Sequence, residues 1–281
     1  MTGLALILGL TEAASVAALI LGRTGRPVAL AADAPPRAHR RGMCLADAWW
    51  DGKAELDGMT ARLCDPRSPP PAGIVPVYRL SAQEAVRTLF AAVLIDARLA
   101  KRDAPPDLRE LAPLTIGCGP GHAAGAGAHA TCHVAIETGW GPDLGRVLHE
   151  GPTRPLAGEP RVFEGVGRER IVYAPAGGIL HANKPIGAPV SAGEVVARIG
   201  AMPVAAPIAG TIRGLMRPGL VLRPRDKVLE IDPRPPERAL FTGPGARPTA
   251  IATGICAAVA ELPRAPATSL AKRSANEGRA S

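Results

Sequence analysis

A glycine-rich segment near the middle of the chain carries the clearest pattern for binding chemistry. Gly117, Gly119 and Gly121 form the sequence G-x-G-P-G directly after the apolar run 114–116. A strand that runs into such a turn exposes successive backbone N–H groups, which can hold an anion such as a phosphate. The segment lacks the Gly-Lys-Ser/Thr of a Walker A loop and the spacing of a dinucleotide-binding fingerprint. It predicts either an anion site or an ordinary glycine-rich turn.

The same stretch concentrates cysteine and histidine. Five side chains that can act as ligands or bases fall within 16 residues: Cys118, His122, His129, Cys132 and His133. Their density makes a metal site one hypothesis, with the three histidines as candidate ligands, although the spacing matches no standard zinc pattern. The alternative is a loop of small residues whose histidines are solvated or hydrogen-bonded.

The two cysteines of this stretch suggest a second chemistry. Adjacent residues of a strand point to opposite faces, so Cys132 and His133 are not expected to form a nucleophile–base pair. A transferase or oxidoreductase that uses Cys118 or Cys132 on sulfur or selenium is therefore an alternative hypothesis, and whether the chain is an enzyme stays open.

A basic pair lies after another apolar run. Lys101 and Arg102 follow a strand pattern that ends near Asp96. Loops that follow parallel strands gather at the edge of the sheet where ligands bind. The pair is expected either to face an anion held by residues 119–121 or to form a solvated basic loop.

Residues 1–165 are predicted to form the Rossmann-like α/β domain that positions these groups. The patterns favour strands at 5–8, 28–31, 74–78, 92–96 and 114–117, with helices at 13–21 and 81–90. Ser81 and Glu84 have the spacing of a capping box at the start of the second helix. A strand–helix–strand start of this size implies a parallel sheet.

Residues 166–234 contain an internal duplication with a period of 32. Ala174 and Pro175 recur as Ala206 and Pro207, and further pairs follow at the same spacing. Two such units cannot each bury a face alone, so they are predicted to close around one another into a β-sandwich. The arrangement resembles the barrel-sandwich hybrid of biotinyl and lipoyl carriers. The segment that joins the units, 200–204, contains no lysine, so we expect no biotin or lipoate.

The remainder of the chain is a linker and a short helix in 235–262, with the helix predicted at 250–262, and a tail, 263–281, that is expected to be disordered. The 32 Gly and 30 Pro of the 281 residues exclude a long helical bundle, while 47% apolar residues exclude disorder throughout. The net charge of +8 is dispersed and aromatics are few, so nucleic acid is not an expected partner. Five cysteines without scaffold spacing, and no segment long enough to span a bilayer, favour a cytoplasmic protein without a membrane partner.

Several of these motifs occur together in an order that resembles a known family. The stretches that carry the resemblance are the strand–helix–strand start, 40–48 (RRGMCLADA), 51–52 (DG), 99–102 (LAKR), 117–121 (GCGPG), 132–133 (CH), 137–138 (ET), 144–147 (LGRV), the duplication and 232–234 (DPR). They resemble the YqeB family, accessory proteins of the selenium-dependent molybdenum hydroxylase system. The resemblance implies a role in maturing a molybdenum hydroxylase as partner enzyme, and it adds Arg41 to the candidate cofactor-binding residues.

The leading expectation combines these observations. An accessory protein would bind an anionic cofactor, a nucleotide or a molybdopterin species, through Gly117, Gly119, Gly121, Lys101, Arg102 and Arg41. Cysteine-dependent sulfur or selenium chemistry and a ligand-free interaction scaffold are the alternatives.

Overall fold

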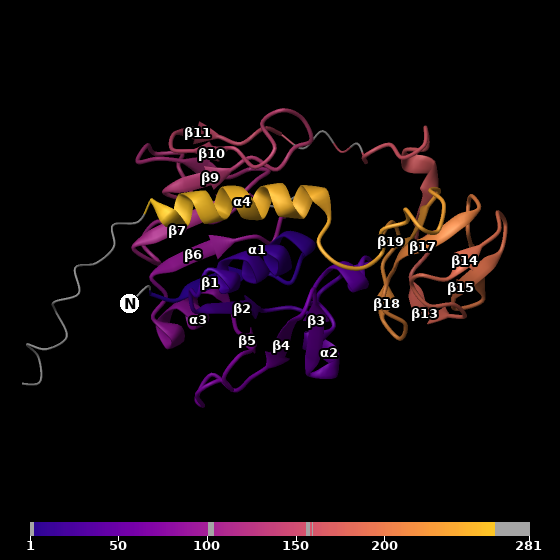
Figure 1. Ribbon diagram of the computed structural model, residues 1–281, viewed down its shortest axis with the longest axis horizontal. Helices are drawn as coiled ribbons and strands as arrows, with labels where there is room; N and C mark the ends of the chain where they lie inside the picture. Colours follow the sequence, from indigo (N-terminus) through magenta and orange to yellow (C-terminus); the bar gives the residue numbers. More distant parts are fainter. Residues whose placement is uncertain (1–2, 101–103, 156–157, 159, 262–281) are drawn as a thin grey trace, which may run out of the picture.

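The computed structural model describes residues 3–100, 104–155, 158 and 160–261. It consists of a nine-stranded mixed sheet with helices on both faces, followed by a β unit made of two four-stranded sheets (Figure 1). The predicted class, α/β followed by β with a C-terminal helix, is confirmed at this level.

The large sheet is parallel except at its two edges. In spatial order its strands are β10 (Val147–Leu148), β9 (Val134–Ile136), β7 (Leu114–Cys118), β6 (Val93–Asp96), β1 (Ala5–Leu8), β2 (Val28–Ala32), β5 (Val75–Arg79), β4 (Met59–Leu63) and β3 (Lys53–Leu56). The strands from β9 to β4 are parallel, whereas β10 and β3 each pair antiparallel to a neighbour. A small two-stranded sheet, β8 (Ala123–Ala124) with β11 (Gly151–Pro152), lies beyond β9.

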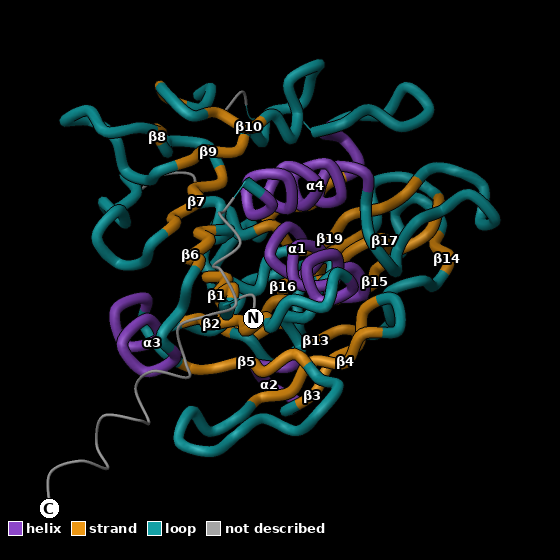
Figure 2. The backbone as a smooth tube through the Cα atoms, turned by 60° about the vertical axis from the view of Figure 1, so that its left-hand side comes forward, coloured by secondary structure: helices purple, strands orange, loops and turns teal. Residues whose placement is uncertain are grey.

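Helices cover the two faces of this sheet. The helical segments are α1 (Glu12–Arg23), α2 (Ala48–Asp51), α3 (Ala82–Leu89), α4 (Ala246–Ala260) and the short 3-10 turns Arg41–Met43 and Arg168–Arg170. Helices α1 and α4 pack side by side on one face and α3 packs on the other (Figure 2). Strand residues alternate accordingly: Ile7 is buried with α1 and α4, and Leu6 is buried on the side of α3.

Local signals explain where the helices begin. Thr11 caps α1 by accepting a hydrogen bond from the N–H of Ala14 at 3.1 Å. The predicted capping box of Ser81 and Glu84 is confirmed at the start of α3. The C-terminal helix begins at Ala246, earlier than the predicted 250–262, because Pro248 falls in the first turn, where proline is tolerated. The expected tail, 263–281, lies outside the described residues.

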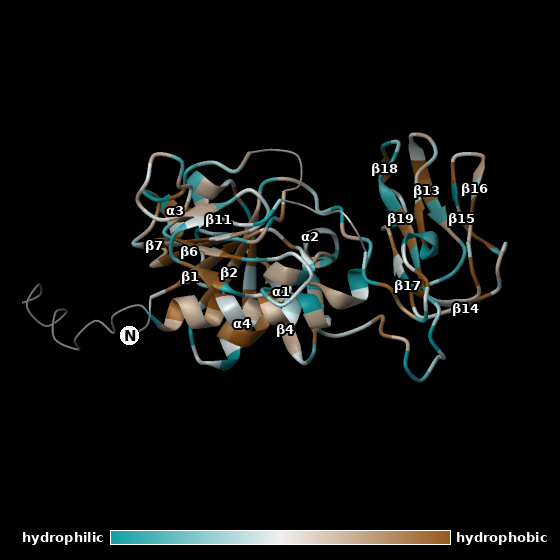
Figure 3. Cartoon of the chain, turned by 90° about the horizontal axis from the view of Figure 1, so that it is seen from above, coloured by the Kyte–Doolittle hydropathy of each residue, from teal (hydrophilic) through white to brown (hydrophobic). Residues whose placement is uncertain are grey.

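The β unit shows why the duplication matters. One sheet has the order β12 (Ile171–Tyr173), β19 (Lys227–Asp232), β17 (Gly210–Leu215), β14 (Pro189–Val190), and the other has β16 (Met202–Ala205), β15 (Val195–Ile199), β13 (Gly178–Ala182), β18 (Val221–Leu222). Strands β14 and β18 each pair with strands of the opposite repeat, so each sheet contains strands of both repeats. The equivalent residues Leu180 and Ile212 lie in one shared core, and hydrophobic residues line the strands of both parts of the molecule (Figure 3).

A buried carboxylate joins the two parts of the chain. Glu230 of β19 is fully buried and accepts hydrogen bonds from His39 at 2.9 Å and from Arg40 at 2.8 and 2.9 Å. Arg170 and Arg213 form ion pairs with it at 2.5 and 3.3 Å. We call Glu230 and these four basic side chains the junction. No helix among the described residues has the length and apolarity that a membrane span requires.

Candidate functional site

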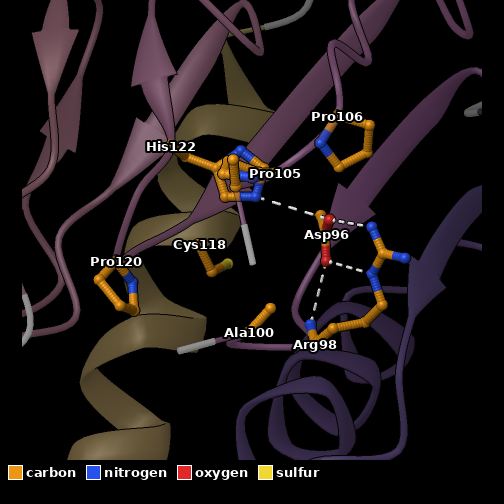
Figure 4. Close-up of a pocket in the computed structure, with 9 residues that line it drawn as sticks. Asp96, Arg98, Ala100, Pro105, Pro106, Cys118, Pro120 and His122 are labelled. Carbon is orange, nitrogen blue, oxygen red and sulfur yellow. Dashed lines mark hydrogen bonds and ion pairs between the residues drawn. The ribbon is translucent and has the colours of Figure 1, made fainter. Parts of the chain in front are cut away.

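The candidate site lies at the carboxyl edge of the large sheet, beside the point where strand order reverses. From β1 the chain first builds β2 to β5 on one side and then places β6 and β7 on the other. Ligands of open α/β sheets bind outside the carboxyl ends of the strands at such a point. A cavity of about 140 Å³ lies there, and its lining residues are Asp96, Arg98, Ala100, Ala104, Pro105, Pro106, Cys118, Pro120 and His122 (Figure 4).

The segments that follow β6 and β7 form the walls of this cavity. Asp96 and Arg98 lie on one side of it, and Cys118 and Pro120 lie on the opposite side (Figure 4). Lys101 and Arg102 lie outside the described residues, but Ala100 and Ala104, which flank them, both line the cavity. The structure thus brings the described residues of the segment after β6 together with the glycine-rich segment after β7.

Asp96 holds two basic side chains at the cavity. Its carboxylate accepts hydrogen bonds from the backbone N–H of Arg98 at 3.1 Å and from the guanidinium Nε and Nη2 at 2.9 and 2.5 Å. The Nε2 of His122 lies 3.5 Å from the same carboxylate. Burial alone would raise the pKa of Asp96, but the hydrogen bonds from Arg98 and His122 lower it well below its ordinary value. The carboxylate therefore stays ionised and orients both side chains.

Gly117 and Thr131 fix the position of His122. The imidazole Nδ1 is hydrogen-bonded to Thr131 Oγ1 at 3.1 Å. A Cβ atom on Gly117 would lie 2.4 Å from the imidazole ring, so only glycine leaves room for it. His122 is thus a buried, hydrogen-bonded histidine. This agrees with the second of the two hypotheses for the histidines, in which they are hydrogen-bonded within the protein.

The other two glycines also make close contacts within the protein. The N–H of Gly119 donates to the carbonyl of Ile136 at 3.0 Å, and a Cβ there would lie 2.8 Å from Thr153. Gly121 is exposed and has φ +94°, a conformation that favours glycine. The glycine pattern therefore reflects packing at Gly117 and Gly119, and Gly121 alone of the three faces solvent.

The two candidate nucleophiles lie in surroundings that oppose thiolate formation. Cys118 is buried at the end of β7, and burial raises its pKa well above the ordinary value. Burial raises the pKa of Cys132 to about 11, and its thiol donates to the carbonyl of Ala123 at 3.4 Å. Because the thiolate is the reactive form, neither cysteine is activated in this structure.

The histidines predicted as metal ligands do not converge. His129 is exposed, and the Nδ1 of His133 accepts from the backbone N–H of Thr115 at 3.1 Å. Within the ranges that the structure describes, no three His, Cys, Asp or Glu side chains are placed to hold a metal ion.

Arg41 lies in a different place from the glycine-rich segment. Its Nε donates to the carbonyl of Leu215 at 3.2 Å and its Nη1 to Asp47 at 2.8 Å, so it contacts the β unit. It lines a second cavity, of about 350 Å³, that does not include the residues of the first. Asp96 and Arg98, in contrast, were not singled out from the sequence as site residues. Their position directly after a predicted buried strand is the signal that could have identified them.

Comparisons with known proteins give one informative relative. No protein-family model matches the chain. It is 34% identical over 263 residues to the uncharacterized protein YqeB of Escherichia coli (strain K12), a match that covers 92% of this chain and 48% of the relative. The chain thus spans about half the length of that relative.

Two solved structures of the ectoine utilization protein EutE (DoeB) from Ruegeria pomeroyi also match. The product-bound form is 21% identical, covers 31% of this chain and 28% of that chain, and has a TM-score of 0.23. The apo form is 13% identical, covers 83% and 87%, and has a TM-score of 0.26. These TM-scores are too low to support a conclusion about fold or function. The similarity to the Escherichia coli protein YqeB, in contrast, extends over most of this chain.

Proposed function

We propose that this chain is an accessory protein that binds an anionic group of a cofactor or nucleotide in the carboxyl-edge cavity. The observation that carries the proposal is the convergence of the segments after β6 and β7 on one cavity, next to the point where strand order reverses.

The side chains of the cavity suit an anion better than an apolar ligand. Asp96 engages the Nε and Nη2 of Arg98, and a guanidinium carries five N–H donors, so further donors of Arg98 can reach a bound group. Arginine recognises phosphate and carboxylate through its planar fork of donors. The imidazole of His122, held by Thr131 on one side and Asp96 on the other, adds a second polar group to the wall.

The size of the cavity limits what it can hold. Pockets that enclose a drug-sized ligand measure about 300–1,000 Å³. At about 140 Å³ the cavity accommodates one small group, and the rest of a nucleotide or molybdopterin species would lie outside it along the carboxyl edge.

The wider role and the finer fold assignment belong to the same proposal. The family resemblance suggests maturation of a molybdenum hydroxylase as the role, with that enzyme as partner and the β unit as its rigid docking surface. Within this proposal the parallel sheet is a Rossmann-like layer, and the two sheets that share strands of both repeats are a barrel-sandwich hybrid. The five cysteines are all free, which suits a reducing compartment such as the cytoplasm.

Isothermal titration calorimetry tests the proposal. Wild type, Gly121→Asp and Gly127→Asp are titrated with nucleotides and with molybdopterin. Gly121 lies beside Pro105 of the cavity wall, whereas a side chain at the exposed Gly127 meets nothing within 4 Å. We expect Gly121→Asp to weaken binding at least about tenfold through charge repulsion and Gly127→Asp to leave it unchanged.

Two results contradict this expectation. Equal binding by all three proteins would remove the cavity as the site, and binding by none of them would favour the ligand-free scaffold. Circular dichroism of each variant separates loss of binding from loss of folding.

A further inference from the structure

Arg247 is a half-buried arginine whose charge has no partner among the described residues. It lies in the first turn of α4, and its Nε donates to the carbonyl of Thr138 at 2.7 Å. That carbonyl is neutral, and no carboxylate of the described chain forms an ion pair with the guanidinium.

The arginines of the junction are different. Arg40, Arg170 and Arg213 each form an ion pair with the buried Glu230. Removing a charge from water is costly unless it is paired, which explains why these three surround one carboxylate. Arg247, in contrast, forms no ion pair of this kind among the described residues. Because its guanidinium is partly removed from water, its pKa is lowered.

The nearby acidic side chains are already engaged. Glu12 raises the pKa of Arg247 through its charge, but both of its carboxylate oxygens accept from Nη1 of Arg40 at 3.2 Å. Glu137 is another electrostatic neighbour, and its oxygens accept backbone N–H groups of Thr138, Gly139 and Arg154. The outer N–H groups of Arg247 can therefore bind an anion that the part of the chain described by the structure does not supply.

Arg247 is tied to the glycine-rich segment. Thr138, which accepts from Arg247, donates its Oγ1 to the carbonyl of Gly119 at 2.8 Å. Cys118, which lines the cavity, is an electrostatic neighbour of Arg247. Arg247 therefore lies at the same edge of the sheet as the cavity, beside the end of β7, without being part of the cavity wall.

We propose that Arg247 binds a second anionic group of the ligand whose first group occupies the carboxyl-edge cavity. This inference rests on the proposed function and narrows its substrate class to ligands with two linked anionic groups, such as a diphosphate. The small cavity takes one group, and the fork of Arg247 takes the next by paired N–H···O bonds.

The test compares inorganic phosphate with inorganic pyrophosphate as calorimetric ligands. The test titrates wild type, Arg247→Gln, Arg247→Lys and Gly121→Asp. Arg87→Gln, at an exposed position on α3, serves as a control for net charge. We expect Arg247→Gln to weaken pyrophosphate binding about 10- to 100-fold, since a hydrogen bond to a charged group contributes about 1.5–3 kcal/mol. Phosphate binding should stay within about twofold, and Arg247→Lys should restore part of the pyrophosphate affinity.

The outcomes separate the two proposals. If Arg247→Gln binds pyrophosphate as tightly as Arg87→Gln while Gly121→Asp loses both anions, the role of Arg247 is wrong and the cavity remains the site. If Arg247→Gln weakens phosphate and pyrophosphate equally, a second group is not its partner. If wild type binds neither anion, both proposals are overturned.

Discussion

The junction and the carboxyl edge use the same kinds of side chain with opposite results. At the junction, both carboxylate oxygens of Glu230 contact basic side chains, namely His39 and three arginines. At the carboxyl edge, Asp96 orients Arg98 and His122 around a cavity, and Arg247 keeps N–H donors that no carboxylate of the described residues accepts. Charged side chains that are paired with one another stabilise a fold. N–H donors without an acceptor in the protein are available to a ligand.

Arg40 connects the two regions. Its Nε and Nη2 bind Glu230 of the β unit, and its Nη1 binds Glu12 in the first turn of α1. The Phe163 ring adds to the junction, with the guanidinium of Arg170 4.6 Å from its centre. The junction thus fixes the β unit to the end of the sheet that carries the candidate site.

The largest expected effect comes from Glu230→Gln. This change leaves Arg170, at 1% side-chain exposure, without a countercharge among the described residues, while Arg213, at 6%, keeps only its ion pair with Asp232 at 3.4 Å. Breaking a buried ion pair from one side costs about 3–5 kcal/mol, which urea unfolding should register as lost stability. The control Glu55→Gln, in an exposed pair with Lys53, should change it by less than about 1 kcal/mol. A loss at position 230 no larger than at the control would contradict the role of the junction.

The junction also predicts how stability depends on pH. Burial lowers the pKa of His39 below its ordinary 6.5, against the opposing hydrogen bond with Glu230. Burial alone would raise the pKa of Glu230, but the hydrogen bond from His39 and the charge of Arg40 hold it far below its ordinary 4.5. For both groups the unfolded chain binds protons at higher pH, so stability falls as the pH drops below 6.5 and falls again below 4.5.

Urea unfolding of wild type and Glu230→Gln at several pH values measures this dependence. The variant should lose less stability than wild type below pH 4.5, because position 230 no longer binds a proton while other carboxylates with lowered pKa values, such as Asp96 and Asp232, still do. Parallel curves for the two proteins in that range would show that Glu230 is not held ionised by its partners.

An intermediate effect is expected from Gly117→Ala at the carboxyl edge. The new Cβ would lie 2.4 Å from the His122 ring, and relief of such overpacking costs about 1–3 kcal/mol. Gly127→Ala, where a Cβ meets nothing within 4 Å, should stay within about 0.5 kcal/mol of wild type. Thermal unfolding of the two variants compares them directly, and equal stability would mean that His122 is not fixed by the glycine.

The smallest effect is expected for alkylation of Cys118 and Cys132 at the carboxyl edge. At near-neutral pH an alkylating reagent should modify the half-buried Cys64 before Cys118 or Cys132, because burial keeps those two thiols protonated and covered. Peptide mass spectrometry at increasing times gives the order. Cys118 reacting first would instead favour the hypothesis of cysteine-dependent chemistry.

Local sequence signals predicted much of the fold. The strand–helix–strand start, the capping box of Ser81 and the duplication each depend on residues close together in the chain or on a fixed repeat, and all three are present. The antiparallel edge strands β3 and β10 and the packing of α4 against α1 were not predicted. They depend on contacts between distant segments that no local pattern encodes.

The site was predicted less completely for the same reason. Described residues of the segments after β6 and β7 line one cavity, because parallel strands place their loops at one edge, but the predicted Lys101 and Arg102 lie outside the described residues. The sequence did not reveal that Gly117 makes room for His122, or that Arg41 contacts the β unit instead of the cavity. Whether an arginine forms an ion pair, as Arg40 does, or has none within the described ranges, as Arg247, follows only from the three-dimensional arrangement.

Hydrogen exchange with and without saturating pyrophosphate tests the contrast between the two regions most directly. The account predicts slower exchange in the described segments of the carboxyl edge, 97–100, 118–122 and 245–249, because ligand contacts reduce local opening there. Exchange at the junction segments 39–41 and 228–232 should stay unchanged, because the charges of that cluster are already paired with one another. Protection confined to the junction, or found in neither region, would contradict the assignment of the carboxyl edge as the binding site.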